Sequence, residues 1–362
     1  MFEVKKHNKK SISWLNKNKK NNNKLISDVL KSKDAKKIYN FSKKEKNLTQ
    51  ENIDALMSAI IRTQNSHYIY LFARDTKYLT KEHIYMLMSA IIELNNAVDI
   101  YNFAKDTRYL NKKDINLLLN AILKTKEALY IYKFAKNIKS LTKENIDALA
   151  NVISETKDAE YIYNFAKDIK NITKENISVL INAIIVTEDI EYIYKFAKDI
   201  KNLTKENISV LTKGIISNYD VDNFISQIGK KYIYLYIKDI KNISNEHFAR
   251  LLNIIIDTND INNFKNILNL YIENKELLEV IKDVVFNLKN KFFIVIYLFI
   301  TNDDELIKQI FKTTDIFSEY LLAYRKELGI KESEIKTFIL NNKFKFVDDA
   351  IDEYVKNSSL KK

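Results

Sequence analysis

A segment of 31 residues repeats six times along this chain without a gap. Its clearest marker is a phenylalanine that has isoleucine three residues and tyrosine two residues before it in every copy. A fixed period of about 20 to 50 residues is typical of proteins built from stacked repeats, in which each unit contacts only its neighbours. The marker residues are Phe41, Phe72, Phe103, Phe134, Phe165 and Phe196.

The composition favours helices along the whole chain. Its 362 residues include no proline and three glycines, the two residue types that most weaken helix interiors. Counted from each marker phenylalanine, apolar residues follow helical spacing from −6 to +1 and again from +12 to +20. We therefore predict that each unit is an antiparallel helical hairpin and that the fold is all-α. Position +8, where the second helix should begin, holds suitable N-cap residues: Thr49, Thr80, Asn111, Thr142, Thr173 and Thr204.

This pattern resembles the α-solenoid families, namely the tetratricopeptide, HEAT-like and pentatricopeptide repeats, over about residues 35–260. The resemblance concerns architecture alone, since the tetratricopeptide signature has a period of about 34 residues and Trp, Gly and Pro positions that this chain lacks. It implies a right-handed superhelix of stacked hairpins that acts as a binding scaffold. The families named bind proteins or, for the last, single-stranded RNA.

The departures from the period divide the chain into four segments. Tyr236 takes the place of the marker phenylalanine in a seventh unit, 40 residues after Phe196, so nine residues are inserted. Gly214 and Gly229 fall in or beside this insertion, and we expect a kink or a short extra helix there. The predicted segments are a basic arm or capping helix (1–33), six repeats (34–218), the seventh repeat (219–260) and a divergent helical C-terminal cap (261–362), in which 292–300 is a buried helix.

The positive charge is concentrated at the N-terminus. The net charge is +12, and residues 1–50 hold 15 lysines and 4 acidic residues, a balance of +11 that leaves about +1 for the rest. This arm could contact nucleic acid or an anionic membrane surface, although a capping helix or a solvated tail is the interpretation we favour. The chain has no cysteine, its N-terminus lacks the apolar core of a secretory signal, and its longest apolar run is nine residues. We expect a soluble, cytoplasmic protein.

Two rows of basic residues follow the first helix of each unit. They could form a phosphate-binding ribbon, but cations at a helix C-terminus also compensate the helix dipole, and we favour this second interpretation. The tyrosine at −2 never changes to phenylalanine, so we predict that its hydroxyl bonds to the next repeat. The +2 row is Lys43, Arg74, Lys105, Lys136, Lys167 and Lys198, and the +5 row is Lys46, Lys77, Arg108, Lys139, Lys170 and Lys201.

The second helix should expose positions +13 and +17. Small, varied side chains on a regular scaffold can determine which partner binds, although exposed positions also vary when nothing constrains them. We take these two rows as the candidate partner-binding surface. The +13 row is Asp54, Tyr85, Asn116, Asp147 and Ser178, and the +17 row is Ser58, Ser89, Asn120, Asn151 and Asn182.

No catalytic or metal-binding motif is recognisable. The four histidines, His7, His67, His83 and His247, show no metal-ligand spacing, and three scattered glycines cannot build a phosphate-cradling loop. We therefore predict a non-enzymatic protein without metal or cofactor, whose function is to bind a protein or peptide. The alternative is a nucleic-acid-binding protein that uses residues 1–33 and the two basic rows.

Overall fold

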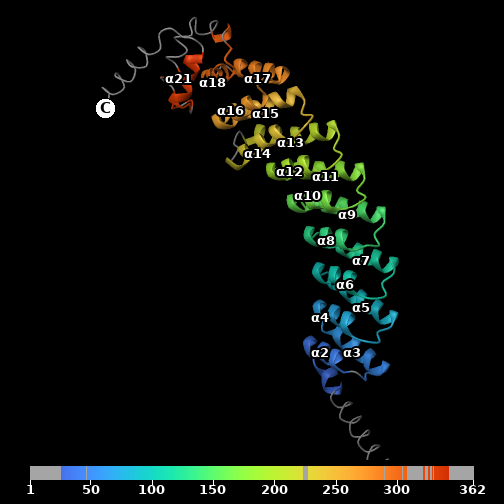
Figure 1. The fold of residues 1–362 in the computed structure, drawn as a ribbon. Coiled ribbons are helices and arrows are strands. Elements are labelled where there is room, and N and C mark those ends of the chain that lie inside the picture. Colours follow the sequence, from blue (N-terminus) through green and yellow to red (C-terminus); the bar gives the residue numbers. More distant parts are fainter. Residues whose placement is uncertain are drawn as a thin grey trace, which may run out of the picture. The chain divides into compact units, whose positions relative to one another are not determined.

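The computed structural model describes residues 26–45, 47–222, 227–288, 290–303, 305–307, 321–322, 325–326, 328 and 330–341. These residues form α-helices joined by short turns, and no strand occurs among them (Figure 1). The all-α prediction and the stacked helical hairpins are confirmed. The chain divides into two compact units, residues 1–183 and 184–362, and each is described by itself.

The first unit is a stack of helical hairpins. Each first helix has 10 residues and each second helix 13 or 14. First helices contact first helices of the adjacent hairpins, and second helices contact second helices. The helices are α2 (Ala35–Lys44), α3 (Gln50–Arg62), α4 (Ser66–Asp75), α5 (Lys81–Leu94), α6 (Ala97–Asp106), α7 (Lys112–Thr125), α8 (Ala128–Asn137), α9 (Lys143–Glu155), α10 (Ala159–Asp168) and the start of α11 (Lys174–Val186).

The second helices begin at the residues predicted to cap them. Thr49 accepts a hydrogen bond from the backbone N–H of Asn52, and Thr142 accepts one from Asn145. Asn111 accepts from the backbone N–H groups of Lys113 and Asp114. Because the first turn of a helix has no intrahelical partners for its N–H groups, these side chains determine where each second helix starts.

The marker phenylalanines form the core between the two layers of helices. Phe72, Phe103, Phe134 and Phe165 have no exposed surface, and the isoleucine three residues before each of them is equally buried. Burying a side chain of this size contributes roughly 1.5–3 kcal/mol. Phe41, in the first repeat, is only half-buried.

The second unit is also built of helical hairpins. Its described part contains no extra helix for the inserted residues. Its helices up to the seventh repeat are α12 (Ile190–Asp199), α13 (Lys205–Asp222), α14 (Gln227–Asp239) and α15 (Asn245–Asp257). Gly214 lies inside α13, which runs on to Asp222, so no helix ends at this glycine. A Cβ at Gly214 would lie 2.7 Å from the Ile185 side chain, so close packing explains the glycine. Residues 223–226 lie outside the described residues.

Tyr236 fills the core position of the seventh repeat, as predicted. It is fully buried, and its hydroxyl lies 3.1 Å from the hydroxyl of Thr212, so the added polar atom has a partner. Burial raises the pKa of Tyr236 far above its ordinary value, which keeps the phenol neutral.

Hairpin stacking continues beyond the end of the 31-residue period. Helices α16 (Ile261–Tyr271) and α17 (Lys275–Asn287) pack on α14 and α15, and α18 (Lys291–Thr301) packs on α16. The predicted buried helix at 292–300 is α18, and the ring of its Phe293 contacts Phe264 of α16 at 4.9 Å between centroids. The 31-residue sequence period therefore ends near residue 260, whereas the helices continue to stack beyond it. The last described helix is α21 (Glu332–Asn341).

A test of this packing comes from position +4, the C-cap residue that directly follows each first helix. Thr107 has a buried hydroxyl with no hydrogen-bond partner, whereas Ile138 and Ile169 occupy the same position in later repeats with similar backbone angles. We expect Thr107→Ile to raise the free energy of unfolding by about 0.5–2 kcal/mol, because an unpaired buried hydroxyl is destabilising. Urea unfolding followed by circular dichroism measures this.

The matched control is Thr76→Ile at the same position one repeat earlier. The Thr76 hydroxyl bonds to Ser42 at 3.3 Å, so its removal forfeits a bond that Thr107 does not make. If the two variants changed stability equally, the unpaired hydroxyl would not be the cause.

Candidate functional site

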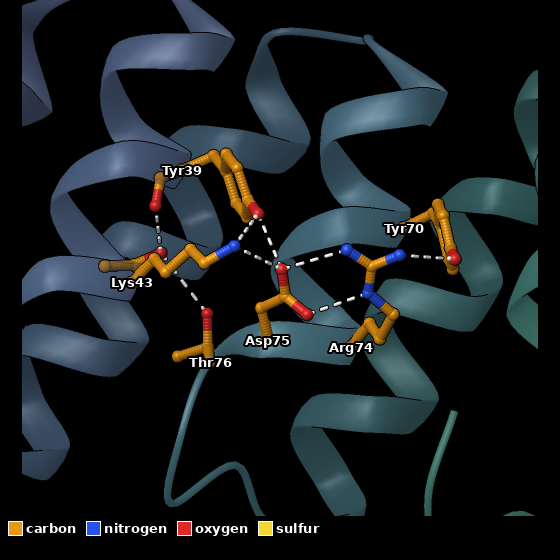
Figure 2. A network of polar contacts seen from close by, with 7 residues as sticks. Tyr39, Lys43, Tyr70, Arg74, Asp75 and Thr76 are labelled. Carbon is orange, nitrogen blue, oxygen red and sulfur yellow. Dashed lines mark hydrogen bonds and ion pairs between the residues drawn. The ribbon is translucent and has the colours of Figure 1, made fainter. Parts of the chain in front are cut away.

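The tyrosine at −2 joins each hairpin to the next through a cluster of three side chains, called the clasp here. It consists of that tyrosine, the basic residue at +2 and the Asp or Asn at +3 of the following repeat. In the first clasp, Tyr39 Oη donates to Asp75 Oδ2 at 2.6 Å (Figure 2). Lys43 Nζ donates to the same two oxygens at 3.0 and 3.1 Å. Since Asp75 ends α4, the clasp ties α2 to α4.

Figure 2 shows how the first clasp leads into the second. Arg74 donates to both carboxylate oxygens of Asp75, at 2.7 and 3.0 Å, and its Nη1 donates to Tyr70 Oη at 2.9 Å. Tyr70 Oη in turn donates to Asp106 at 2.7 Å. The hydrogen bonds from Arg74, Tyr39 and Lys43 hold the pKa of Asp75 far below its ordinary value, so it is a carboxylate.

The clasp recurs in both units. Tyr132 Oη donates to Asp168 at 2.5 Å in the first unit, and Tyr194 Oη donates to Asp239 at 2.6 Å in the second. The fourth repeat has Asn137 at +3, and its side-chain amide donates to Tyr101 Oη at 2.9 Å instead. The prediction that the −2 hydroxyl bonds to the next repeat is confirmed.

The +2 row is engaged by these clasps. Lys136 and Lys198 contact both a tyrosine hydroxyl and a carboxylate, Lys167 donates to the Tyr163 hydroxyl at 2.7 Å, and Lys105 lies 5.9 Å from the Tyr101 ring centroid. The hydrogen bonds that Lys136 donates to Asp168 and then to Tyr132 Oη raise the pKa of Lys136. A phosphate would have to compete with these partners for the +2 cations.

The +5 row differs, because its described members are exposed and form no ion pair within the described part of the chain: Lys77, Arg108, Lys139, Lys170 and Lys201. Lys46 of this row lies outside the described residues, as does most of the basic arm, residues 1–25. A further row of exposed lysines, missed in the sequence, stands at +9, the first residue of the second helix: Lys81, Lys112, Lys143, Lys174 and Lys205.

The +13 row of the candidate partner-binding surface is partly used to join second helices. Three of its members bond to position +11 of the following repeat: His83 Nε2 lies 2.6 Å from Asp54, Asn145 donates to Asn116 at 3.2 Å, and Asn176 donates to Asp147 at 2.7 Å. Tyr85 and Ser178 of the same row are exposed, and no bond to a neighbouring repeat is formed by either within the described residues.

The +17 row has no side-chain bond to a neighbouring repeat within the described residues. Ser58, Asn120, Asn151 and Asn182 are exposed, and the half-buried Ser89 bonds to a carbonyl of its own helix. This row, with Tyr85 and Ser178 of the +13 row, is therefore the part of the predicted surface that is not used to join repeats.

A groove opens where the N-terminal turns of consecutive second helices meet. The groove between the second and third repeats has a volume of about 360 Å³, and Tyr85, Met86 and Tyr109 line it together with Lys81 and Asp114. The equivalent residues of the sixth and seventh repeats, among them Ser209 and Asn242, line a groove of about 530 Å³. The tyrosine at +6 of the second and third repeats, where the fifth to seventh repeats have asparagine, is the signal of this groove in the sequence.

The described residues contain no group of three or more His, Cys, Asp or Glu side chains placed to hold a metal ion. His83 is part of a capping box with Thr80, and His67 lies 3.4 Å from Asp99. Within the same residues, the helices are too short or too polar to cross a lipid bilayer.

No protein-family model and no curated protein matches this chain. Two solved structures of designed proteins are similar to it at low identity. A designed self-assembling cyclic homo-oligomer is 15% identical, with 88% of this chain and 97% of that chain covered and a TM-score of 0.11. A de novo designed 16-helix transmembrane nanopore is 17% identical, with 85% and 100% covered and a TM-score of 0.12. At these TM-scores neither similarity carries an argument about this chain.

The clasp predicts how stability depends on pH. The hydrogen bond from Lys136, followed by that from Tyr132, lowers the pKa of Asp168 in the folded protein. Such a carboxyl group adds stability above its unfolded pKa of about 4, and this is lost as pH falls through the lower folded value. We expect Asp168→Asn to be less stable than the wild type by about 0.2–1 kcal/mol at pH 7. The difference should shrink as pH falls below the unfolded pKa of about 4 and through the lower folded value.

Urea unfolding at a series of pH values measures this difference. The variant should keep its fold, since Asn137 occupies the same position in the fourth repeat and still bonds to its tyrosine. A difference that stayed constant with pH would show that the charge of Asp168 contributes nothing.

Proposed function

We propose that this protein is a non-enzymatic scaffold that binds another protein through the second helices of its hairpins, centred on the +17 row. The observation that supports this most directly is the free state of that row, while the +2 row and much of the +13 row are used to join repeats. Helices held by a buried core and by clasps offer a partner a surface that loses little conformational entropy on binding.

The side chains of the +17 row suit contact with a protein. Serine and asparagine are short, so a partner's backbone can approach closely, and both can donate and accept hydrogen bonds. Outside residues 1–50 the chain carries a net charge of only about +1, whereas a surface that follows a phosphate backbone is expected to be basic along its length.

Binding of nucleic acid is the second candidate, and the exposed, unpaired +5 row favours it. Together with the lysines at +9, it places two cations at the turn between the two helices in the second to sixth hairpins. Binding of this kind weakens steeply with salt, because each neutralised phosphate releases counterions.

The scaffold proposal is tested by capturing partners from nuclease-treated extract of the source cells with tagged full-length protein. We expect Asn120→Lys with Asn151→Lys to lose the captured proteins, because two long charged side chains would then stand in the centre of the surface. Lys213 occupies the same +17 position in the sixth repeat, so a hairpin of this chain accommodates lysine there.

The matched control is Asn102→Lys with Asn164→Lys, which adds the same charge on first helices. Lys133 and Lys195 stand at the equivalent positions of other repeats. Partners kept by the control and lost by the +17 variant support the proposal. Equal loss in both, or recovery of nucleic acid alone from untreated extract, would contradict it.

A further inference from the structure

The groove between the second and third repeats is the most aromatic exposed surface of the described chain. Tyr78, Tyr85 and Tyr109 are 70%, 55% and 64% exposed, and Met86 is 49% exposed. These four side chains lie within 32 residues of sequence, in two consecutive repeats. Tyr85, Met86 and Tyr109 line one groove, and Tyr78 occupies the same turn position as Tyr109 one repeat earlier. Exposed apolar clusters of this kind mark interaction sites.

The backbone at two of these tyrosines is in a conformation that tyrosine disfavours. Tyr78 has φ 64° and Tyr109 has φ 67°, in the left-handed region. The same turn position is asparagine in the fifth, sixth and seventh repeats, with φ between 62° and 66° at Asn171, Asn202 and Asn242. Asparagine enters this region far more readily than a bulky residue does. Since the tyrosine rings are exposed, burial within the chain does not compensate for the disfavoured backbone.

Basic residues flank the groove in the sequence. Lys81 lines it, and Lys77 and Arg108 of the +5 row, with Lys112 and Lys113, stand next to the turn and helix-start residues; all five are exposed and form no ion pair within the described part of the chain. The two acidic side chains at the groove, Glu82 and Asp114, serve the helix starts instead. Asp114 accepts the backbone N–H of Asn111 at 2.9 Å, and bonds to its own backbone and to Thr80 lower the pKa of Glu82. Both remain ionised carboxylates, but the five cations named above outnumber them, and this balance favours an anionic ligand.

We infer that this groove binds an acidic peptide segment of a partner protein that carries an aromatic or large apolar side chain. The inference rests on the proposed scaffold function and adds the place and the chemistry of the partner. The apolar side chain would pack between Tyr85 and Tyr109, and its acidic neighbours would face Lys77 and Arg108. Tyrosine is enriched at the energetic centres of protein interfaces, because its rigid ring gives a large contact area at low entropic cost.

Selection from a random-peptide phage library on immobilised full-length protein tests the inference. We expect the recovered peptides to combine aromatic or large apolar residues with Asp or Glu. Their affinity, measured by fluorescence polarisation, should fall about tenfold or more in Tyr85→Ser with Tyr109→Asn, as for loss of aromatic contacts at the centre of an interface. Both replacements occur at these positions in other repeats, so Tm should stay the same or rise. No enrichment, basic peptides, or unchanged affinity in the variant would overturn the inference.

Two further double variants test how much the basic side chains contribute to peptide binding. Lys77→Gln with Arg108→Gln should weaken the selected peptides, whereas Lys139→Gln with Lys170→Gln, in the same row of later repeats, should not. Equal weakening by both pairs would show that affinity comes from the general charge of the row and would contradict a groove-specific site. A labelled oligothymidylate that bound, and weakened equally with both pairs, would identify nucleic acid as the ligand instead.

The two proposals fail in different ways. If captured partners or selected peptides depend on Asn120 and Asn151 but not on Tyr85 and Tyr109, the scaffold function stands and the groove inference falls. If neither pair of residues affects binding, both proposals fail.

Discussion

The burial of phenylalanine and isoleucine between neighbouring hairpins is the interaction on which the rest of this structure depends. A two-helix hairpin cannot cover both of its apolar faces, so each unit needs the next one to remove these side chains from water. Phe72, Phe103, Phe134 and Phe165 have no exposed surface, whereas Phe41 in the first repeat is half-buried. Each part of the hydrophobic core is thus formed by neighbouring repeats together. The residues outside this core form the surface of the protein.

Hydrophobic burial alone does not fix how one helix is positioned along its neighbour, and the hydrogen bonds of the clasps supply this constraint. A tyrosine hydroxyl that must reach the Asp or Asn of the next hairpin fixes how far one first helix lies along its neighbour, and the +2 cation completes the cluster. The polar bonds from +11 to +13 act in the same way between second helices. Together they explain why so many polar residues recur at fixed positions without forming a ligand site.

Among the described residues, the +17 row, the exposed lysines at +5 and +9, and the groove of the second and third repeats are not used to join repeats. The +17 row is polar, and the groove is aromatic, is flanked in sequence by basic residues, and has two tyrosines with disfavoured backbone angles. The groove stands where the chain departs from its own repeat pattern at a cost to local stability, and this departure is one of the observations from which we infer a binding site there.

The period, the helical hairpin, its caps, the buried phenylalanines and the need for a partner at the Tyr hydroxyl all follow from the sequence, because they depend on residues close together in the chain or on the same position in each copy. Only the tertiary structure identified Asp75 and its equivalents as the partners of the tyrosines, because they stand 36 residues away, or 45 across the insertion. Only packing revealed that Gly214 fits against Ile185 inside a continuous helix and that stacking outlasts the period. The aromatic groove also needed the structure, since Tyr85 and Tyr109 come together only when two second helices stack.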